Sequence, residues 1–325
     1  MDRRTMIGGL VCSLFVGPFV ARAQPVGKTY RVAYLTVGSA TGLGLWKDVL
    51  DGLRELGYVE GQNLAWMQAH ADGKVDRLPG LVASLVQWKA DVIVTTSTSE
   101  TMAAKTGAPA TPIVMTLAPD PVEQGLVASL SRPGGTVTGL TNVAPGLSRK
   151  YIELLHEAIP SATRFTVVHG PIDLLPVIRE NLRLGAETFG IRLSFVAVND
   201  PHGFDVVLAH AKQRGASGII APLNSFTWTH RAKLAQAALK HRLPGIYWER
   251  GYVAEGGLIS YSANFAAVGR RAAYFVDRIL KGTKPADLPV EQPTSFNLVI
   301  NESTAKALGI TLPQSLRLRA DEIIQ

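Results

Sequence analysis

Apolar and polar positions change their spacing repeatedly along the chain from Tyr30 onward. Short runs rich in β-branched residues, typical of buried strands, stand at 31–37, 91–95, 112–116 and 136–140. Between them, in 46–56 and 78–85, apolar residues recur at the spacing of amphipathic helices. Alternation of this kind predicts a parallel sheet with helices on both faces.

The same alternation begins again in the second half of the chain. Strands are expected at 164–168, 192–197, 217–221 and 243–247, with helices at 174–189, 204–214 and 231–241. Two open α/β units of similar size, joined near 140–147, predict two Rossmann-like lobes with parallel sheets.

The C-terminal part is expected to link these units. The segment 256–261 leads into a helix whose apolar positions run to Leu280, and the three prolines within 285–293 prevent an immediate new helix. A last strand follows at 295–300, and then a short helix at 303–308. If this segment revisits both lobes, three connections join them and allow hinge closure over a cleft. The expected division is a first lobe of 28–140 plus 259–285 and a second lobe of 141–258 plus 286–325.

The first 23 residues have the order of an export signal peptide. Asp2-Arg3-Arg4 is a basic start, the run 6–20 is apolar, and Ala21-Arg22-Ala23 is a small-x-small cleavage signal. The apolar run is shorter than the roughly 20 residues of a membrane span, and a permanent N-terminal anchor is the alternative. We therefore expect residues 1–23 to be removed and the mature protein to lie in the periplasm, after export by the secretory or the twin-arginine route.

Charge and cysteine content exclude several classes of protein. The chain of 325 residues carries 33 basic and 26 acidic side chains, a net charge of +7, without a lysine- or arginine-rich run. A nucleic-acid partner is not expected, because such proteins cluster positive charge with stacking aromatic rings. The single cysteine, Cys12, lies in the signal, so the mature chain has neither disulfides nor cysteine chemistry.

Sequence motifs for catalysis, cofactors and metals are missing. There is no G-x-S-x-G nucleophile elbow and no Walker loop, and the glycine-rich turn 38–44 lacks the dinucleotide-binding spacing. The seven histidines form no compact ligand set. We expect no enzyme activity, no cofactor and no metal site. An exported α/β enzyme is the alternative from another class, and it would need a nucleophile and a base in the cleft.

Polar and aromatic residues at the carboxyl ends of the expected strands form the candidate ligand site, because those ends face the crevice in open α/β sheets. In the first lobe they are Ser39, Thr41, Thr96, Ser97, Thr98 and Asp120. In the second lobe they are His169, Asn224, Ser225, Phe226, Tyr247, Glu249 and Tyr252.

Most of these candidates also have a simpler structural interpretation. Hydroxyls and free backbone N–H groups at 96–98 suit a carboxylate, or else cap a helix. Glu249 among aromatic rings suits an ammonium group, or else pairs with Arg250 at the surface. Asp120 is otherwise a turn residue, and Phe226 otherwise packs on a helix.

Several longer segments indicate a family. They are 55–63, 120–122, 125–127, 132–139, 256–261 and 276–293, the last being the most specific. Across essentially the whole mature chain, the sequence resembles the solute-binding proteins of ABC importers, in particular periplasmic proteins related to tryptophan- and tyrosine-uptake components. The resemblance implies a type I periplasmic-binding fold with a three-strand hinge. It also implies a monomer, a small-molecule solute, and an ABC permease with its ATPase in the inner membrane as partner. Where many relatives have Asn-Pro, this chain has Gly170-Pro171.

The resulting hypothesis is a periplasmic protein that captures a small solute, such as an amino acid, between its lobes and delivers it to a permease. For a zwitterionic solute, the hydroxyls at 97–98 would hold the carboxylate, and Asp120 or Glu249 the ammonium group. Tyr247 and Phe226 would contact the solute's side chain. The alternative is a ligand-sensing periplasmic protein of the same fold that signals to a membrane receptor.

Overall fold

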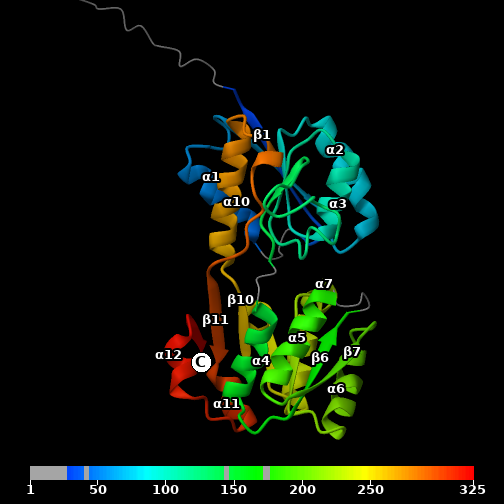
Figure 1. The fold of residues 1–325 in the computed structure, drawn as a ribbon, viewed down its shortest axis with the longest axis vertical. Helices are drawn as coiled ribbons and strands as arrows, with labels where there is room; N and C mark the ends of the chain where they lie inside the picture. Colours follow the sequence, from blue (N-terminus) through cyan, green and yellow to red (C-terminus); the bar gives the residue numbers. More distant parts are fainter. Residues whose placement is uncertain (1–27, 40–43, 143–145, 171–175) are drawn as a thin grey trace, which may run out of the picture.

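The computed structural model describes residues 28–39, 44–142, 146–170 and 176–325, which form two α/β lobes (Figure 1). The first lobe lies above the second in Figure 1, and the long axis of the molecule runs through both. The predicted signal peptide lies outside the described residues. Among the helices that the structure describes, none has the length and apolar character needed to cross a membrane.

The first lobe is built on a five-stranded parallel sheet with the strand order β2-β1-β3-β4-β5. The strands are β1 (Tyr30–Thr36), β2 (Leu64–His70), β3 (Val92–Thr95), β4 (Ile113–Met115) and β5 (Val137–Gly139). Four of them were expected from the sequence. The edge strand β2 was not, because most of its residues are half-buried and its mixed polarity hides the strand pattern.

Helices cover both faces of this sheet, as predicted. They are α1 (Leu45–Glu55), α2 (Leu78–Gln87), α3 (Thr98–Gly107) and α10 (Phe265–Leu280). Val32 and Tyr34 of β1 share a core with α1 and α10. Ala33 and Leu35, which point to the opposite face, share a core with α2 and α3.

The second lobe is built on a seven-stranded sheet with the order β12-β11-β10-β9-β8-β6-β7. The strands are β6 (Arg164–His169), β7 (Arg192–Ala197), β8 (Gly218–Ala221), β9 (Gly245–Tyr247), β10 (Ile259–Ala263), β11 (Phe296–Asn301) and β12 (Glu322–Ile324). Its pairs are parallel except β10 with β11. The helices are α4 (Leu147–Ala158), α5 (Pro176–Thr188), α6 (Gly203–Gln213), α7 (Ser225–Thr229), α8 (Arg231–Lys240), α9 (Arg250–Ala254), α11 (Glu302–Leu308) and α12 (Gln314–Arg319).

Three connections join the lobes, as predicted: one between β5 and α4, one between β10 and α10, and one before β11. The expected lobe boundaries need correction. Residues 259–263 were expected in the first lobe, whereas this strand pairs with β9 and β11 in the second sheet. Residues 286–291 were expected in the second lobe, whereas Val290 and Glu291 donate backbone hydrogen bonds to Leu130 and Gly139 of the first lobe. Both segments lie next to a connection. The hydrophobic pattern alone does not show at which residue the chain passes from one lobe to the other.

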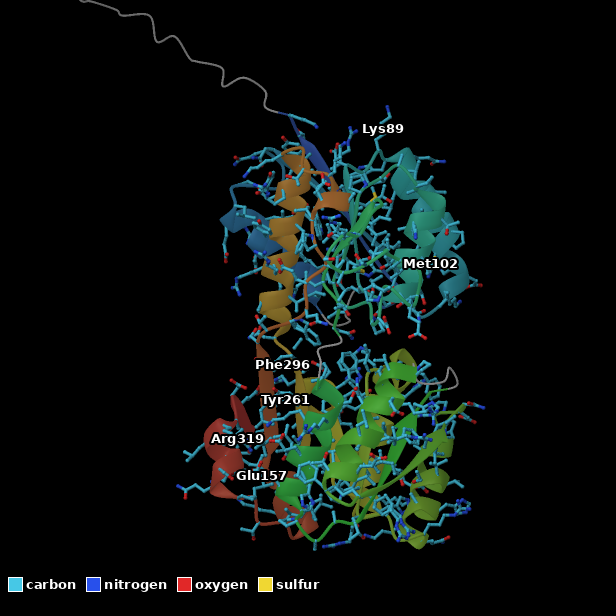
Figure 2. The ribbon with its side chains drawn as sticks, in the orientation of Figure 1. Lys89, Met102, Glu157, Tyr261, Phe296 and Arg319 are labelled. Atoms are coloured by element: carbon cyan, nitrogen blue, oxygen red, sulfur yellow. The ribbon has the colours of Figure 1, made fainter. Side chains whose placement is uncertain are left out.

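The connections contact one another. Thr141 N–H donates to Glu291 O at 2.9 Å, which sets the first and third connections side by side. The Glu291 carboxylate forms two hydrogen bonds with Arg271 of α10, at 2.7 and 2.6 Å. On β10 and β11, the rings of Tyr261 and Phe296 stack with centroids 5.4 Å apart (Figure 2). The described parts of the three connections are therefore held close to one another by hydrogen bonds and ring contacts.

Candidate ligand-binding site

A cavity of about 310 Å³ lies between the lobes, where β5 runs into the first connection. It is lined by Asp120, Pro121, Val122 and Leu130 of the first lobe, Thr141, Gly146 and Gln292 of the connections, and Val177 and Asn181 of α5. Both lobes therefore enclose one space, and its volume is at the lower end of the range for small-molecule sites.

Asp120 lines this cavity from a left-handed turn. Its φ is +41°, in a region that Asp tolerates better than most residues. Its backbone carbonyl accepts the Gln124 N–H at 3.0 Å, and its carboxylate accepts the Glu123 N–H at 3.3 Å. The hydrogen bond with Asp120 raises the pKa of the Glu123 carboxyl. Asp120 is thus a turn residue and a cavity residue at once.

The hydroxyls expected to contact a ligand after β3 differ in their surroundings. Thr96 is buried and donates to Glu100 Oε1 at 2.8 Å, so its proton is already used inside the lobe. Ser97 is the N-cap residue of α3, but its side chain makes no capping hydrogen bond. The Thr98 Oγ1 atom is buried and has no hydrogen-bond partner among the described residues. Ser39 is exposed just beyond β1, and Thr41 lies outside the described residues.

Sequence reasoning missed Glu100, a buried acid in the first turn of α3. Its Oε1 accepts the Val37 N–H at 2.6 Å in addition to the Thr96 hydroxyl, so it joins the ends of β1 and β3. The signal that could have found it is the spacing between Ser97 and Glu100, which matches a capping box.

Three candidates of the second lobe lie together at the edge that faces the first lobe, around α7 (Figure 1). Asn224 caps α7 by accepting the N–H groups of Phe226 and Thr227. His169, at the end of β6, is buried and its Nδ1 donates to Gly170 O at 2.9 Å. A Cβ on Gly170 would lie 2.5 Å from Asn224 Oδ1 and 2.7 Å from Phe226 Cβ, so the ends of β6 and β8 are in close contact. The side chain of Ser225 lies outside the description.

Tyr247 and Tyr252 do not line the cleft, in contrast to the expectation. Both are fully buried in the second-lobe core, with rings stacked at 4.8 Å. The Tyr252 hydroxyl donates to Thr227 and accepts from Trp248 Nε1. Burial raises the pKa of both phenols. Tyr247 ends β9 and Tyr252 lies in α9 just after it, which suggested the crevice, but their rings pack against each other in the core.

Glu249 is separated from Asp120. It caps α9 by accepting the Gly251 N–H, and it lines a different cavity of about 260 Å³ beside β10 and β11. The expected pairing of Glu249 with Arg250 is not the main contact, because the Arg250 guanidinium binds Glu322. Burial raises the pKa of Glu249. Within the described residues, no group of His, Cys, Asp and Glu is arranged to hold a metal ion.

Comparison with known proteins agrees with this architecture. The family model described as ABC transporter substrate binding protein matches residues 41–324. A tyrosine-binding protein of Clostridioides difficile (strain R20291) is 26% identical over 279 residues, which are 85% of this chain and 78% of that protein.

Two solved structures have the same fold. A conserved domain protein from Vibrio cholerae O1 biovar El Tor is 28% identical, with a TM-score of 0.84 over 91% of this chain and all of the other. An ABC domain from Streptococcus pneumoniae in complex with L-Trp is 24% identical, with the same TM-score and coverage. The protein therefore belongs to the family of ABC transporter substrate-binding proteins.

Proposed function

We propose that this protein captures an aromatic amino acid, or a small solute of similar size, between its lobes and delivers it to the permease of an ABC importer. The observation that carries the proposal is the cavity of about 310 Å³ whose lining comes from both lobes and the connections. A relative that is called tyrosine-binding and a structural neighbour that holds L-Trp support this class of solute. The protein then acts as a monomer in the periplasm, after residues 1–23 are removed.

The binding cleft combines groups from each lobe in this proposal. The first lobe contributes Ser97, Thr98 and Asp120. The second lobe contributes Asn224 and Phe226 from its rim, which is the edge around α7 that faces the first lobe. Contacts to both lobes at once favour the closed state, because a solute shifts a conformational equilibrium only by its differential affinity.

Calorimetric titration with L-tyrosine and L-tryptophan tests the proposal, together with the variant Asp120→Asn. We expect saturable binding of one molecule per chain to the wild type. Asparagine keeps the left-handed backbone accessible and removes the charge, so affinity for the zwitterion should fall by about 2 kcal/mol, roughly thirtyfold.

The matched control is Asp72→Asn, because Asp72 is exposed, also has a positive φ of 51°, and pairs with Arg77 away from the cavity. Its affinity should equal that of the wild type. If neither amino acid binds the wild type, the proposed solute class is wrong.

A further inference from the structure

The second-lobe wall of the cavity between the lobes is formed by Val177 and Asn181 of α5. These positions are four residues apart, so their side chains lie on the same face of the helix. Ile178 and Leu182, each one residue further along, are buried in the second-lobe core. The core therefore fixes the position of α5, and Asn181 lines the cavity from a well-packed helix.

The face of α5 that lines the cavity is uncharged. The two basic residues of this helix, Arg179 and Arg183, lie over the ring of Phe195 in the edge strand β7, with guanidinium carbons 4.4 and 6.0 Å from the ring centroid. Of the described residues that line the cavity, none is Lys, Arg or His. A solute carboxylate therefore has no basic partner in this lining.

Among the described lining residues, Asp120 alone carries a charge. Its Oδ1 atom accepts the Glu123 N–H at 3.3 Å. An ionised carboxylate has about four acceptor positions, so this hydrogen bond leaves room for an ammonium group. The nearby acid Glu291 is already engaged, because Arg271 donates two hydrogen bonds to its carboxylate, at 2.7 and 2.6 Å. The charge of the cavity therefore favours the ammonium end of a solute beside Asp120.

Resting on the proposed function, we propose that Asn181 is a specificity-determining residue whose Oδ1 accepts a hydrogen bond from the ammonium group of the solute, while Asp120 binds the same group from the first lobe. An ammonium group has three donors and can serve both acceptors. Glu249, the second-lobe acid expected from the sequence for this group, lines a different cavity. Since the two acceptors belong to opposite lobes, sharing the ammonium group between them favours the closed state.

Three probes with one phenol ring and different charges test this assignment: L-tyrosine, tyramine, and 3-(4-hydroxyphenyl)propanoate. They are titrated calorimetrically into the wild type and into Asn181→Leu, which keeps a branched side chain and removes the acceptor. The wild type should bind tyramine more tightly than the propanoate. Asn181→Leu should weaken tyrosine and tyramine by roughly tenfold each and leave the propanoate unchanged.

Two further variants sharpen the test. Asn181→Asp offers the ammonium group a second carboxylate, so it should strengthen tyramine and weaken the propanoate. The matched control is Gln213→Leu, which removes an exposed amide at the end of α6 in the same lobe, outside the cavity lining. It should leave the affinities of all three probes unchanged.

Each other outcome has a definite meaning. If Asn181→Leu weakens the three probes equally, Asn181 only shapes the cavity and the inference is wrong. If it weakens the propanoate alone, the amide holds the carboxylate and the inference is wrong as well. If Asn181→Leu does not fold, Asn181→Asp decides, and unchanged affinities for tyramine and the propanoate overturn the inference.

The titrations also separate this inference from the proposed function. If tyrosine binds the wild type and both Asn181 variants with equal affinity, the inference fails and the proposed function stands. If no probe binds the wild type, the proposed function fails, and the inference with it.

Discussion

Gly170 allows two chain segments at the rim of the second lobe to pack closely. Its missing side chain lets the end of β6 approach Asn224 and Phe226. In Gly170→Ala, the new Cβ displaces Asn224 Oδ1, so the N–H groups of Phe226 and Thr227 lose their cap, at a cost of about 1 kcal/mol. We expect several-fold weaker solute binding and a small loss of thermal stability. Gly203→Ala is the matched control, because its Cβ would meet only Val198 at 3.4 Å. Equal affinities of both variants for the solute would contradict this role of Gly170.

At the residue scale, the sequence indicated some site residues and misjudged others. Asp120, expected near the ligand because it follows a strand, lines the cavity between the lobes, and its contact with a solute stays a prediction. The same rule was wrong for Tyr247, since an aromatic side chain at the end of a strand can also pack into the core. Glu100 was missed because only the folded chain brings its carboxyl to Val37, 63 residues away.

At the scale of elements, the first lobe depends on close packing of α1 against α10. A Cβ on Gly269 would lie 2.3 Å from Asp48 Cβ, and one on Gly52 would lie 2.8 Å from Ala273 Cβ. Gly269→Ala should therefore destabilise the protein by about 2 kcal/mol, through separation of the two helices. Gly80→Ala, in α2 with open space around it, should instead stabilise by about 0.5–1 kcal/mol. Urea denaturation measures both changes, and a stable Gly269→Ala variant would show that the helices separate without cost.

The strands that carry a hydrophobic run were predictable, and those that do not were missed. Buried strands such as β3 and β8 are uniformly apolar or β-branched over short runs. β2 and β12 are edge strands with half-buried residues, so tertiary pairing, not local pattern, makes them strands. The five-residue helices α7 and α9 are set by their caps, Asn224 and Glu249, which the periodicity of apolar residues does not reveal.

At the scale of the whole molecule, buried residues of α4 to α8 form one core with the second sheet, and the first sheet has its own cores on either face. The two lobes do not share these cores, so we expect movement at the connections and not within a lobe. The alternation of strands and helices predicted this division. It did not predict the residues at which the chain passes between the lobes. Glu291 contacts Gly139 and Thr141 through backbone hydrogen bonds, which leave no pattern of side chains in the sequence.

Closure of the lobes should depend on the rim of the second lobe as much as on the first. Phe226 of α7 is half-buried against Phe204 and His230. The helix α7 lies at the edge of the second lobe that faces the first (Figure 1). Phe226→Ala removes apolar contact available only in the closed state, so solute affinity should fall by about tenfold. The difference in solute affinity between the closed and open states is then smaller. The variant saturated with solute should therefore stay more open than the saturated wild type. Small-angle scattering with and without saturating solute measures this difference in radius of gyration, with Val206→Ala on exposed α6 surface as the control. Full compaction of the saturated Phe226→Ala variant would show that the first lobe alone drives closure.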